Sequence, residues 1–145
     1  MIKIICMGKI KEEYLNNLIK DYQKRISKYH KIEIIELKDT NDLAKEAIDI
    51  EKHIQPNDYV IALDINGETI DSISLANKID KIFITNPNIT FIIGSSYGLD
   101  ESIKKRANYL LSFSKLTFPH GLFRGMLLEQ IYRSFKILNN EQYHK

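Results

Sequence analysis

Two polar loops in the last third of the chain have residue types that bind small ligands through their backbone. One is Gly-Ser-Ser-Tyr-Gly from Gly94 to Gly98, and the other is Phe-Ser-Lys-Leu-Thr-Phe from Phe113 to Phe118. Glycine has no Cβ, so the first loop can approach a ligand closely, although a tight turn between a strand and a helix would use glycine equally well. In the second loop Ser114, Lys115 and Thr117 supply donors, while its two phenylalanines could instead pack in the core.

The C-terminus, Tyr143-His144-Lys145, is the other candidate for chemistry. An imidazole exchanges protons near neutral pH, and a phenol stands beside it in the sequence. Chain ends are often disordered, which is the alternative interpretation of this tail. The tail is therefore a candidate for general acid–base catalysis only if other residues hold it in place.

Several other kinds of site are not supported by the sequence. It contains no phosphate-binding P-loop and no Gly-x-Ser-x-Gly nucleophile motif, and the spacing in Gly94–Gly98 is not that of a dinucleotide-binding fingerprint. The four histidines are scattered and there is only one cysteine, so we expect no metal site.

Strands and helices alternate along the chain and must position these loops. Short apolar runs predict strands at 2–7, 31–37, 59–63, 89–93 and 109–113, and apolar residues at helical spacing predict helices that end at 27, 54, 81, 107 and 138. This alternation predicts an α/β domain with a mostly parallel sheet covered on both faces. In such sheets ligands bind beyond the carboxyl ends of the strands, which is where both polar loops fall.

Side chains at the ends of these elements predict caps and turns. We expect the segment Asp39-Thr40-Asn41-Asp42 to cap the second helix, Ser72 the third and Asp100 the fourth. Asn66-Gly67 predicts a turn after the third strand.

The last helix is apolar over more than half of its circumference. Its apolar residues are Leu122, Phe123, Met126, Leu127, Leu128, Ile131, Tyr132, Phe135 and Leu138. A helix of this kind is buried on two sides, and a second copy of the chain is the covering layer that we expect. Gly125 would then allow a partner helix to approach closely, whereas the alternative is a central helix within a monomer.

The composition indicates one globular domain over residues 1–145. Hydrophobic residues make up 43% of the chain and charged residues 28%, which is ordinary for a globular protein. A single cysteine, Cys6, cannot form a disulfide within the chain and favours a reducing compartment. The apolar N-terminal run reaches Lys9 within a few residues and is too short for a signal peptide, so we expect a cytoplasmic protein. Positive charge is concentrated in 101–145, which has eight Lys or Arg and three acidic residues.

Three segments together resemble a known family. They are Leu-Ser-Phe-Ser-Lys-Leu-Thr-Phe-Pro-His at 111–120, Leu-Leu-Glu-Gln-Ile-Tyr-Arg-Ser-Phe-Lys-Ile at 127–137, and the terminal Tyr-His-Lys. Their sequences closely resemble the small ribosomal large-subunit pseudouridine N3-methyltransferases of the SPOUT superfamily, and the resemblance extends back to Gly8-Lys9 and Leu63–Gly67. It covers essentially the whole chain and is strongest from Phe91 onward.

The resemblance implies a three-layer α/β domain with a C-terminal trefoil knot, with the cofactor-binding region in about 89–145. It implies a homodimer, S-adenosylmethionine as methyl donor, and a pseudouridine of 23S ribosomal RNA on the assembled ribosome as acceptor. By matching position, the cofactor contacts would be Leu63, Gly94, Phe113, Ser114, Lys115, Leu116, Thr117 and Phe118. The polar loops had already indicated most of this set, but not Leu63.

Methyl transfer to N3 requires that the imide proton leave. We hypothesise that His144 is the base, that Tyr143 orients it, and that Arg133 offsets the charge on the flanking carbonyls. The tail would reach the cofactor pocket of the partner subunit; for Arg133 the alternative is an ordinary surface charge. The candidates for phosphate contacts in RNA are Lys104, Lys105, Arg106, Arg124 and Lys136.

The sequence departs from the family pattern at three places. Ser95 stands where the family usually has a second glycine, and Gly121 and Gly125 replace larger residues, which could loosen the start of the last helix. The segment between Leu37 and Pro56 is also shorter than usual, in a region remote from the expected site.

Other functions stay open at this point. A catalytically silent RNA- or ribosome-binding module would bind no cofactor, and a small flavodoxin-like protein would bind a flavin. Within the SPOUT superfamily, methylation of a transfer RNA would also suit the basic C-terminal third.

Overall fold

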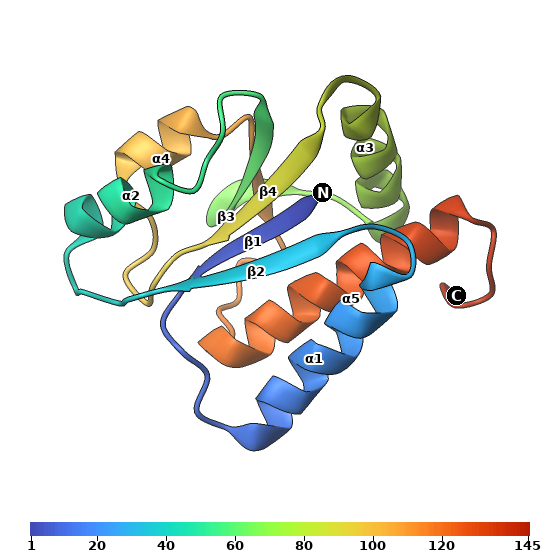
Figure 1. The fold of residues 1–145 in the computed structure, drawn as a ribbon, viewed down its shortest axis with the longest axis horizontal. Helices are drawn as coiled ribbons and strands as arrows, with labels where there is room; N and C mark the ends of the chain where they lie inside the picture. Colours follow the sequence, from blue (N-terminus) through green and yellow to red (C-terminus); the bar gives the residue numbers. More distant parts are fainter.

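The computed structural model describes all residues, 1–145, and contains one parallel sheet with the strand order β2-β1-β4-β3-β5 (Figure 1). Its strands are β1 Ile2–Met7, β2 Ile32–Leu37, β3 Asp58–Thr69, β4 Asn88–Ile93 and β5 Tyr109–Ser112. Its helices are α1 Glu13–Ser27, α2 Leu43–Glu51, α3 Ser72–Thr85, α4 Glu101–Arg106 and α5 His120–Leu138. Because every strand is parallel to its neighbours, all of the carboxyl ends lie along one edge of the sheet.

Helices cover both faces of the sheet. Helices α1, α3 and α5 pack on one face and α2 and α4 on the other. Successive side chains of a strand point to opposite faces: Phe91 lies in the core under α1, α3 and α5, and Ile92 lies in the smaller core under α2 and α4. The prediction of a three-layer parallel α/β domain is confirmed, and the trefoil knot stays a prediction of the resemblance.

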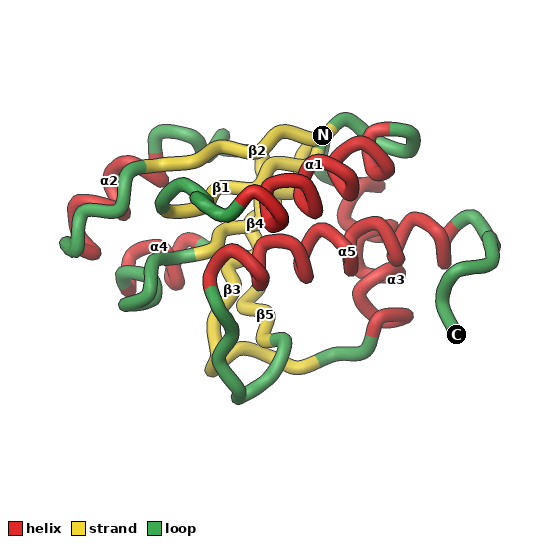
Figure 2. Tube along the Cα trace, turned by 90° about the horizontal axis from the view of Figure 1, so that it is seen from below, coloured by secondary structure: helices red, strands yellow, loops and turns green.

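Helix α5 lies between α1 and α3 (Figure 2). A Cβ on Gly125 would lie 2.7 Å from a side-chain carbon of Leu18 in α1, and one on Gly121 would lie 2.9 Å from Leu15. The close approach that Gly125 permits is therefore made by α1 of the same chain, and the sequence-based assignment to a partner helix was wrong. No helix of the structure is both long enough and apolar enough to cross a membrane.

Strand β3 is longer than predicted. It continues through Asn66-Gly67 to Thr69, and its pairing with β5 shifts register, since both Leu63 and Glu68 are paired with Leu111. A Cβ on Gly67 would lie 2.7 Å from the backbone of Leu110. The predicted turn at Asn66-Gly67 was wrong because these residues belong to an irregular part of β3 that lies against β5.

Two caps were predicted correctly and one was not. The carboxylate of Asp42 accepts a hydrogen bond from the backbone N–H of Ala44 (3.1 Å) and caps α2, and Asp100 caps α4 in the same way. Asp71, not Ser72, caps α3 by accepting from the Ser74 N–H at 2.7 Å. The negative charge of a carboxylate at this position also interacts favourably with the positive N-terminal end of the helix dipole. The boundaries of α2 and α3 also differ from the prediction, since α2 ends at Glu51 and α3 at Thr85.

Candidate functional site

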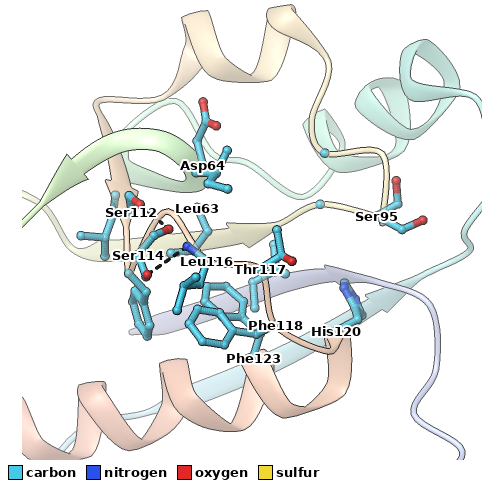
Figure 3. A pocket seen from close by; sticks show the side chains of 17 residues that line it. Leu63, Asp64, Ser95, Ser112, Ser114, Leu116, Thr117, Phe118, His120 and Phe123 are labelled. Atoms are coloured by element: carbon cyan, nitrogen blue, oxygen red, sulfur yellow. Dashed lines mark hydrogen bonds between the residues drawn. The ribbon is translucent and has the colours of Figure 1, made fainter.

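A cavity of about 450 Å³ lies at the carboxyl ends of β3, β4 and β5 (Figure 3). We call it the loop cavity; it is lined by Leu63, Asp64, Ile65, Ile93, Gly94, Ser95, Ser96, Gly98, Leu111, Ser112, Phe113, Ser114, Leu116, Thr117, Phe118, His120 and Phe123. The structure thus brings together every expected cofactor contact except Lys115, which is exposed and does not line the cavity.

The loop after β4 folds back on itself at Gly94. A Cβ there would lie 2.4 Å from the carbonyl oxygen of Gly98 and 2.7 Å from its carbonyl carbon. Gly98 has a positive φ of 88°, and its N–H donates to the carbonyl of Ser95 at 2.9 Å. A side chain at Gly94 would therefore push the loop away from the position that forms this wall of the cavity.

Ser95 has a polar atom without a partner. Its side chain is buried and lines the loop cavity, and its Oγ makes no hydrogen bond in the structure. Buried hydroxyls are nearly always hydrogen-bonded. The orphaned Oγ therefore fits a polar ligand that completes this wall, and it shows that the departure at Ser95 adds a polar group to the cavity.

The loop after β5 is held by its own hydrogen bonds and by aromatic packing. Ser112 Oγ donates to the Ser114 carbonyl at 3.1 Å, and Ser114 Oγ accepts from the Leu116 N–H at 3.0 Å (Figure 3). The rings of Phe113 and Phe118 pack on Phe123 of α5, with centroids 5.0 and 5.9 Å away. Phe113 and Phe118 therefore do both things predicted for them: their rings pack on α5 and anchor the loop, and they also line the cavity.

Sequence reasoning missed several residues of the loop cavity. Asp64, Ser112 and Phe123 line it directly, and His120 reaches it from the start of α5, where its Nε2 lies 2.8 Å from the carbonyl oxygen of Met7. The end of the third strand and the start of the last helix could have indicated them, because those segments meet at the carboxyl edge of a parallel sheet.

The C-terminal residues join α5 in a second group of polar side chains, which we call the tail cluster: Glu129, Arg133, Tyr143 and His144. One carboxylate oxygen of Glu129 accepts from Arg133 Nε at 3.0 Å, from Arg133 Nη2, and from the Tyr143 hydroxyl at 3.0 Å. Arg133 Nη1 lies 3.1 Å from His144 Nδ1. The tail thus has specific contacts with α5, as a catalytic role requires, and the three predicted catalytic residues lie together.

The surroundings of Tyr143 and Arg133 raise the pKa of both side chains. Burial raises the pKa of Tyr143, and hydrogen bonds with Tyr22 and Glu129 act in the same direction. The hydrogen bond to Glu129 raises the pKa of Arg133, whose guanidinium also lies 4.8 Å from the centre of the Tyr143 ring. Tyr143 therefore remains a neutral donor and Arg133 remains a cation at physiological pH.

The tail cluster does not open into the loop cavity. His144 and Glu129 instead line a neighbouring cavity of about 590 Å³, the tail cavity, which also includes Asp71 of the α3 cap and Met126. Arg133 and Tyr143 line neither cavity. The two cavities share Leu111, Ser112 and Phe113, so they adjoin each other at the end of β5.

Arg124 was wrongly predicted to contact phosphate. Only 1% of it is exposed, its Nη1 lies 2.6 Å from Glu36 Oε2, and its Nη2 donates to the Gly8 carbonyl at 3.1 Å. A buried guanidinium needs such partners because its desolvation is costly. Arg124 therefore ties the start of α5 to Glu36 of β2 and to the backbone at Gly8, just after β1.

The other four predicted phosphate contacts have less buried side chains. Lys105 is exposed on α4, whereas Lys104 lies 3.5 Å from Asp64 and Arg106 donates to the Gln55 carbonyl. Lys136 lies 2.9 Å from Glu141 near the tail cluster.

Two solved structures share this fold. A probable methylase family protein from Haemophilus influenzae aligns over 99% of this chain and 70% of its own, with a TM-score of 0.57 and 14% identity. The SpoU methyltransferase AviRb from Streptomyces viridochromogenes, solved with AdoMet, aligns over 92% of this chain with a TM-score of 0.50 and 9% identity. This chain spans 57% of the AviRb chain. The fold is therefore that of the SpoU-like methyltransferases.

The sequence defines the family more closely. Residues 1–144 match the family described as "Predicted SPOUT methyltransferase", and the chain belongs to this family. It is 47% identical to the ribosomal RNA large subunit methyltransferase H of Caldicellulosiruptor saccharolyticus over 100% of both chains, and 51% identical to that of a Clostridium botulinum strain over 99% of both. A putative ribosomal RNA large subunit methyltransferase H of Methanococcus maripaludis is 49% identical over 99% of both chains.

Proposed function

We propose that this chain transfers a methyl group from S-adenosylmethionine to N3 of a pseudouridine in 23S ribosomal RNA, on the assembled ribosome. The observation that carries this proposal is the end-to-end match to relatives named as large-subunit ribosomal RNA methyltransferases, at 47–51% identity. An enzyme with this substrate works in the cytoplasm, where ribosomes are.

The loop cavity has the character that this cofactor needs. The single domain would bind it with residues from about 89–145 together with Leu63 of β3. Gly94 allows the backbone of one wall to pack closely on the backbone of Gly98. The 113–118 loop supplies backbone N–H and C=O groups, and the Oγ of Ser95 is free to hydrogen-bond to a polar atom of the cofactor. When bound there, the cofactor supplies an electrophilic methyl group on a sulfonium; the protein positions the acceptor in line and excludes water.

The tail cluster would act on the acceptor base. Arg133 is a fixed cation that can offset negative charge developing on the imide carbonyls. Glu129 holds the hydroxyl of Tyr143, so the ring of Tyr143 orients the tail. His144, at the outer end of the cluster, would contact the base directly.

We also propose that the enzyme is a homodimer in which the tail of one chain completes the loop cavity of the other. Two features support a composite site. His144 lies outside the loop cavity of its own chain, and the apolar side chain of Leu116, which lines that cavity, is 73% exposed. Two impaired variants, Gly94→Ala and His144→Ala, should regain activity when mixed and refolded together, because one site of the mixed dimer has both intact parts. No recovery, or a monomer in equilibrium sedimentation at micromolar concentration, would contradict the dimer.

Calorimetric titration of S-adenosylmethionine, followed by labelled methyl transfer, tests the function. The acceptors are ribosomes that lack the modification and, for comparison, bulk transfer RNA. Binding with transfer to ribosomes is the expected result. Transfer to transfer RNA alone would favour the other SPOUT activity, and absence of cofactor binding would favour a silent RNA-binding module.

A further inference from the structure

The hydrogen bonds of the tail cluster have a direction that follows from the chemistry of their members. The carboxylate of Glu129 is an acceptor only, and the guanidinium of Arg133 is a donor only. Arg133 donates from Nε and Nη2 to Glu129, and its Nη1 points toward His144. Glu129 therefore fixes the orientation of Arg133. Both side chains are largely buried, with Arg133 23% and Glu129 19% exposed.

This direction determines the tautomer of His144. Arg133 Nη1 lies 3.1 Å from Nδ1 of the imidazole, and since the arginine can only donate, Nδ1 must carry a lone pair. A neutral imidazole with a lone pair on Nδ1 has its proton on Nε2. An imidazolium would instead place an N–H on Nδ1 against an N–H of the guanidinium. The Nε2 atom makes no hydrogen bond within the chain, and His144 lines the tail cavity, so the group left to meet a ligand is an N–H donor.

We propose that His144 donates a hydrogen bond from Nε2 to a carbonyl oxygen of the acceptor imide instead of removing its proton, and that Glu129 is the positioning residue that fixes this arrangement through Arg133. The proposal rests on the proposed function and replaces the assignment of His144 as a base. The N3–H bond breaks with its electron pair left on N3, and the proton goes to water. That pair then forms the N–CH₃ bond as the S–CH₃ bond breaks and leaves its pair on sulfur.

Other polar groups also face the imidazole. Asp71, on the cap of α3, lines the tail cavity with His144, and hydrogen bonds from Ser74 lower its pKa. Tyr143 has already donated its hydroxyl to Glu129. Of these groups only Arg133 is hydrogen-bonded to His144, and it therefore decides which nitrogen holds the proton.

A matched pair of substitutions separates a donor from a base. In His144→Gln the carboxamide N–H takes the place of Nε2–H but cannot accept a proton near neutral pH, whereas His144→Ala removes both properties. We expect His144→Ala to lower the transfer rate by about 10²–10³-fold, the effect of losing a donor to a developing oxyanion, and His144→Gln to lower it by about tenfold. Equal losses in the two variants would overturn the proposal.

The pH dependence gives a second readout. A histidine base makes the rate fall below about pH 6.5, the pKa of an ordinary imidazole. With water as the proton acceptor, the rate should instead rise with pH until the imide itself ionises, with the same profile in the wild type and in His144→Gln. A break near neutral pH that is present in the wild type and absent in His144→Gln would identify a base.

The tautomer is measurable without turnover. In the full-length protein labelled with ¹⁵N-histidine, the His144 signals, assigned by their absence from His144→Gln, should show a proton on Nε2 and none on Nδ1. The opposite tautomer overturns the proposal even if no RNA is methylated. Absence of methyl transfer with the expected tautomer would count against the proposed function alone.

The positioning role of Glu129 is tested by combining its substitution with that of His144. If it acts by fixing Arg133 and His144, Glu129→Ala should lower the rate in the wild type by more than in the His144→Ala background, because residues that act as a unit are not additive. Cofactor affinity should stay unchanged, since Glu129 does not line the loop cavity. Equal losses in the two backgrounds would show that Glu129 does not act through His144.

Discussion

The loop cavity and the tail cluster are built from different parts of the polypeptide. The wall at Gly94 and the loop after β5 present backbone atoms and small side chains, and their shape depends on close packing of main chain on main chain. The tail cluster consists of charged and polar side chains joined by hydrogen bonds to one carboxylate. We therefore expect cofactor affinity to depend on the path of the backbone around the loop cavity. The reaction rate should depend on the charges of the tail cluster.

The largest expected effect on cofactor affinity comes from a change in the loop cavity alone. Gly94→Ala places a Cβ 2.4 Å from a backbone oxygen that cannot rotate away, so it should weaken cofactor binding by about 10²-fold, equivalent to about 3 kcal/mol of overpacking. Calorimetry measures this directly. Tyr97→Ala is the matched control, because Tyr97 is in the same loop, 68% exposed, and does not line the cavity. Equal binding by the two variants would mean that the loop is not a cofactor wall.

The next effect breaks the tail cluster alone. Arg133→Ala should lower the transfer rate by about 10²-fold, as expected for a group that stabilises developing charge, and leave cofactor affinity unchanged. Single-turnover transfer and calorimetry measure the two quantities. Arg25→Ala is the control, since Arg25 also pairs with an acid four residues away, Asp21, but on the surface of α1. If both variants keep wild-type rates, Arg133 is an ordinary surface charge.

A smaller change tests how the tail is held. Tyr143→Phe keeps the ring over Arg133 but removes the hydroxyl that donates to Glu129. Loss of one such hydrogen bond costs about 1 kcal/mol, so the transfer rate should fall by about fivefold. The control is Tyr14→Phe on the exposed part of α1, where Tyr14 is 71% exposed. A loss as large as that of Arg133→Ala would indicate that the hydroxyl contacts the reacting base.

The smallest effect shows which region faces the RNA. Lys105→Ala, on α4, and Lys136→Ala, beside the tail, should each lower ribosome affinity a few-fold and reduce the salt dependence by at most about one unit of slope, the effect of one phosphate contact. We expect the larger change for Lys105, because Lys136 is already paired with Glu141. The reverse order in affinities measured at several salt concentrations would place the RNA backbone nearer the tail.

The loops could be predicted from sequence because their residue types and their positions after apolar strands agree. Gly94 and 113–118 were found in this way, whereas Leu63 was indicated only by resemblance, since an apolar residue in a strand gives no sign that it lines a cavity. Lys115 was included because a cation in a polar loop suggests a ligand, but its position in the loop leaves it exposed.

Long-range pairing explains what the sequence concealed. The burial of Arg124 depends on Glu36, which is 88 residues earlier in the chain, so no local pattern distinguishes it from a surface arginine. The turn at Asn66-Gly67 was overridden by pairing of β3 with β5. Glu129 was overlooked although its spacing from Arg133 is the four residues that place two side chains together on a helix.

The strand order constrains how the protein is made. β1 pairs with β2 and β4, and β3 pairs with β4 and β5, so during synthesis β3 has no strand to join until β4 has left the ribosome. The walls of the loop cavity include the ends of three strands and the loop 113–118, which is translated after all five strands of the sheet. A ligand stabilises only the state that binds it, so it cannot guide the early steps of folding, which depend on distant contacts and are slow for that reason. The nascent chain must complete its sheet unaided before the cofactor can stabilise it.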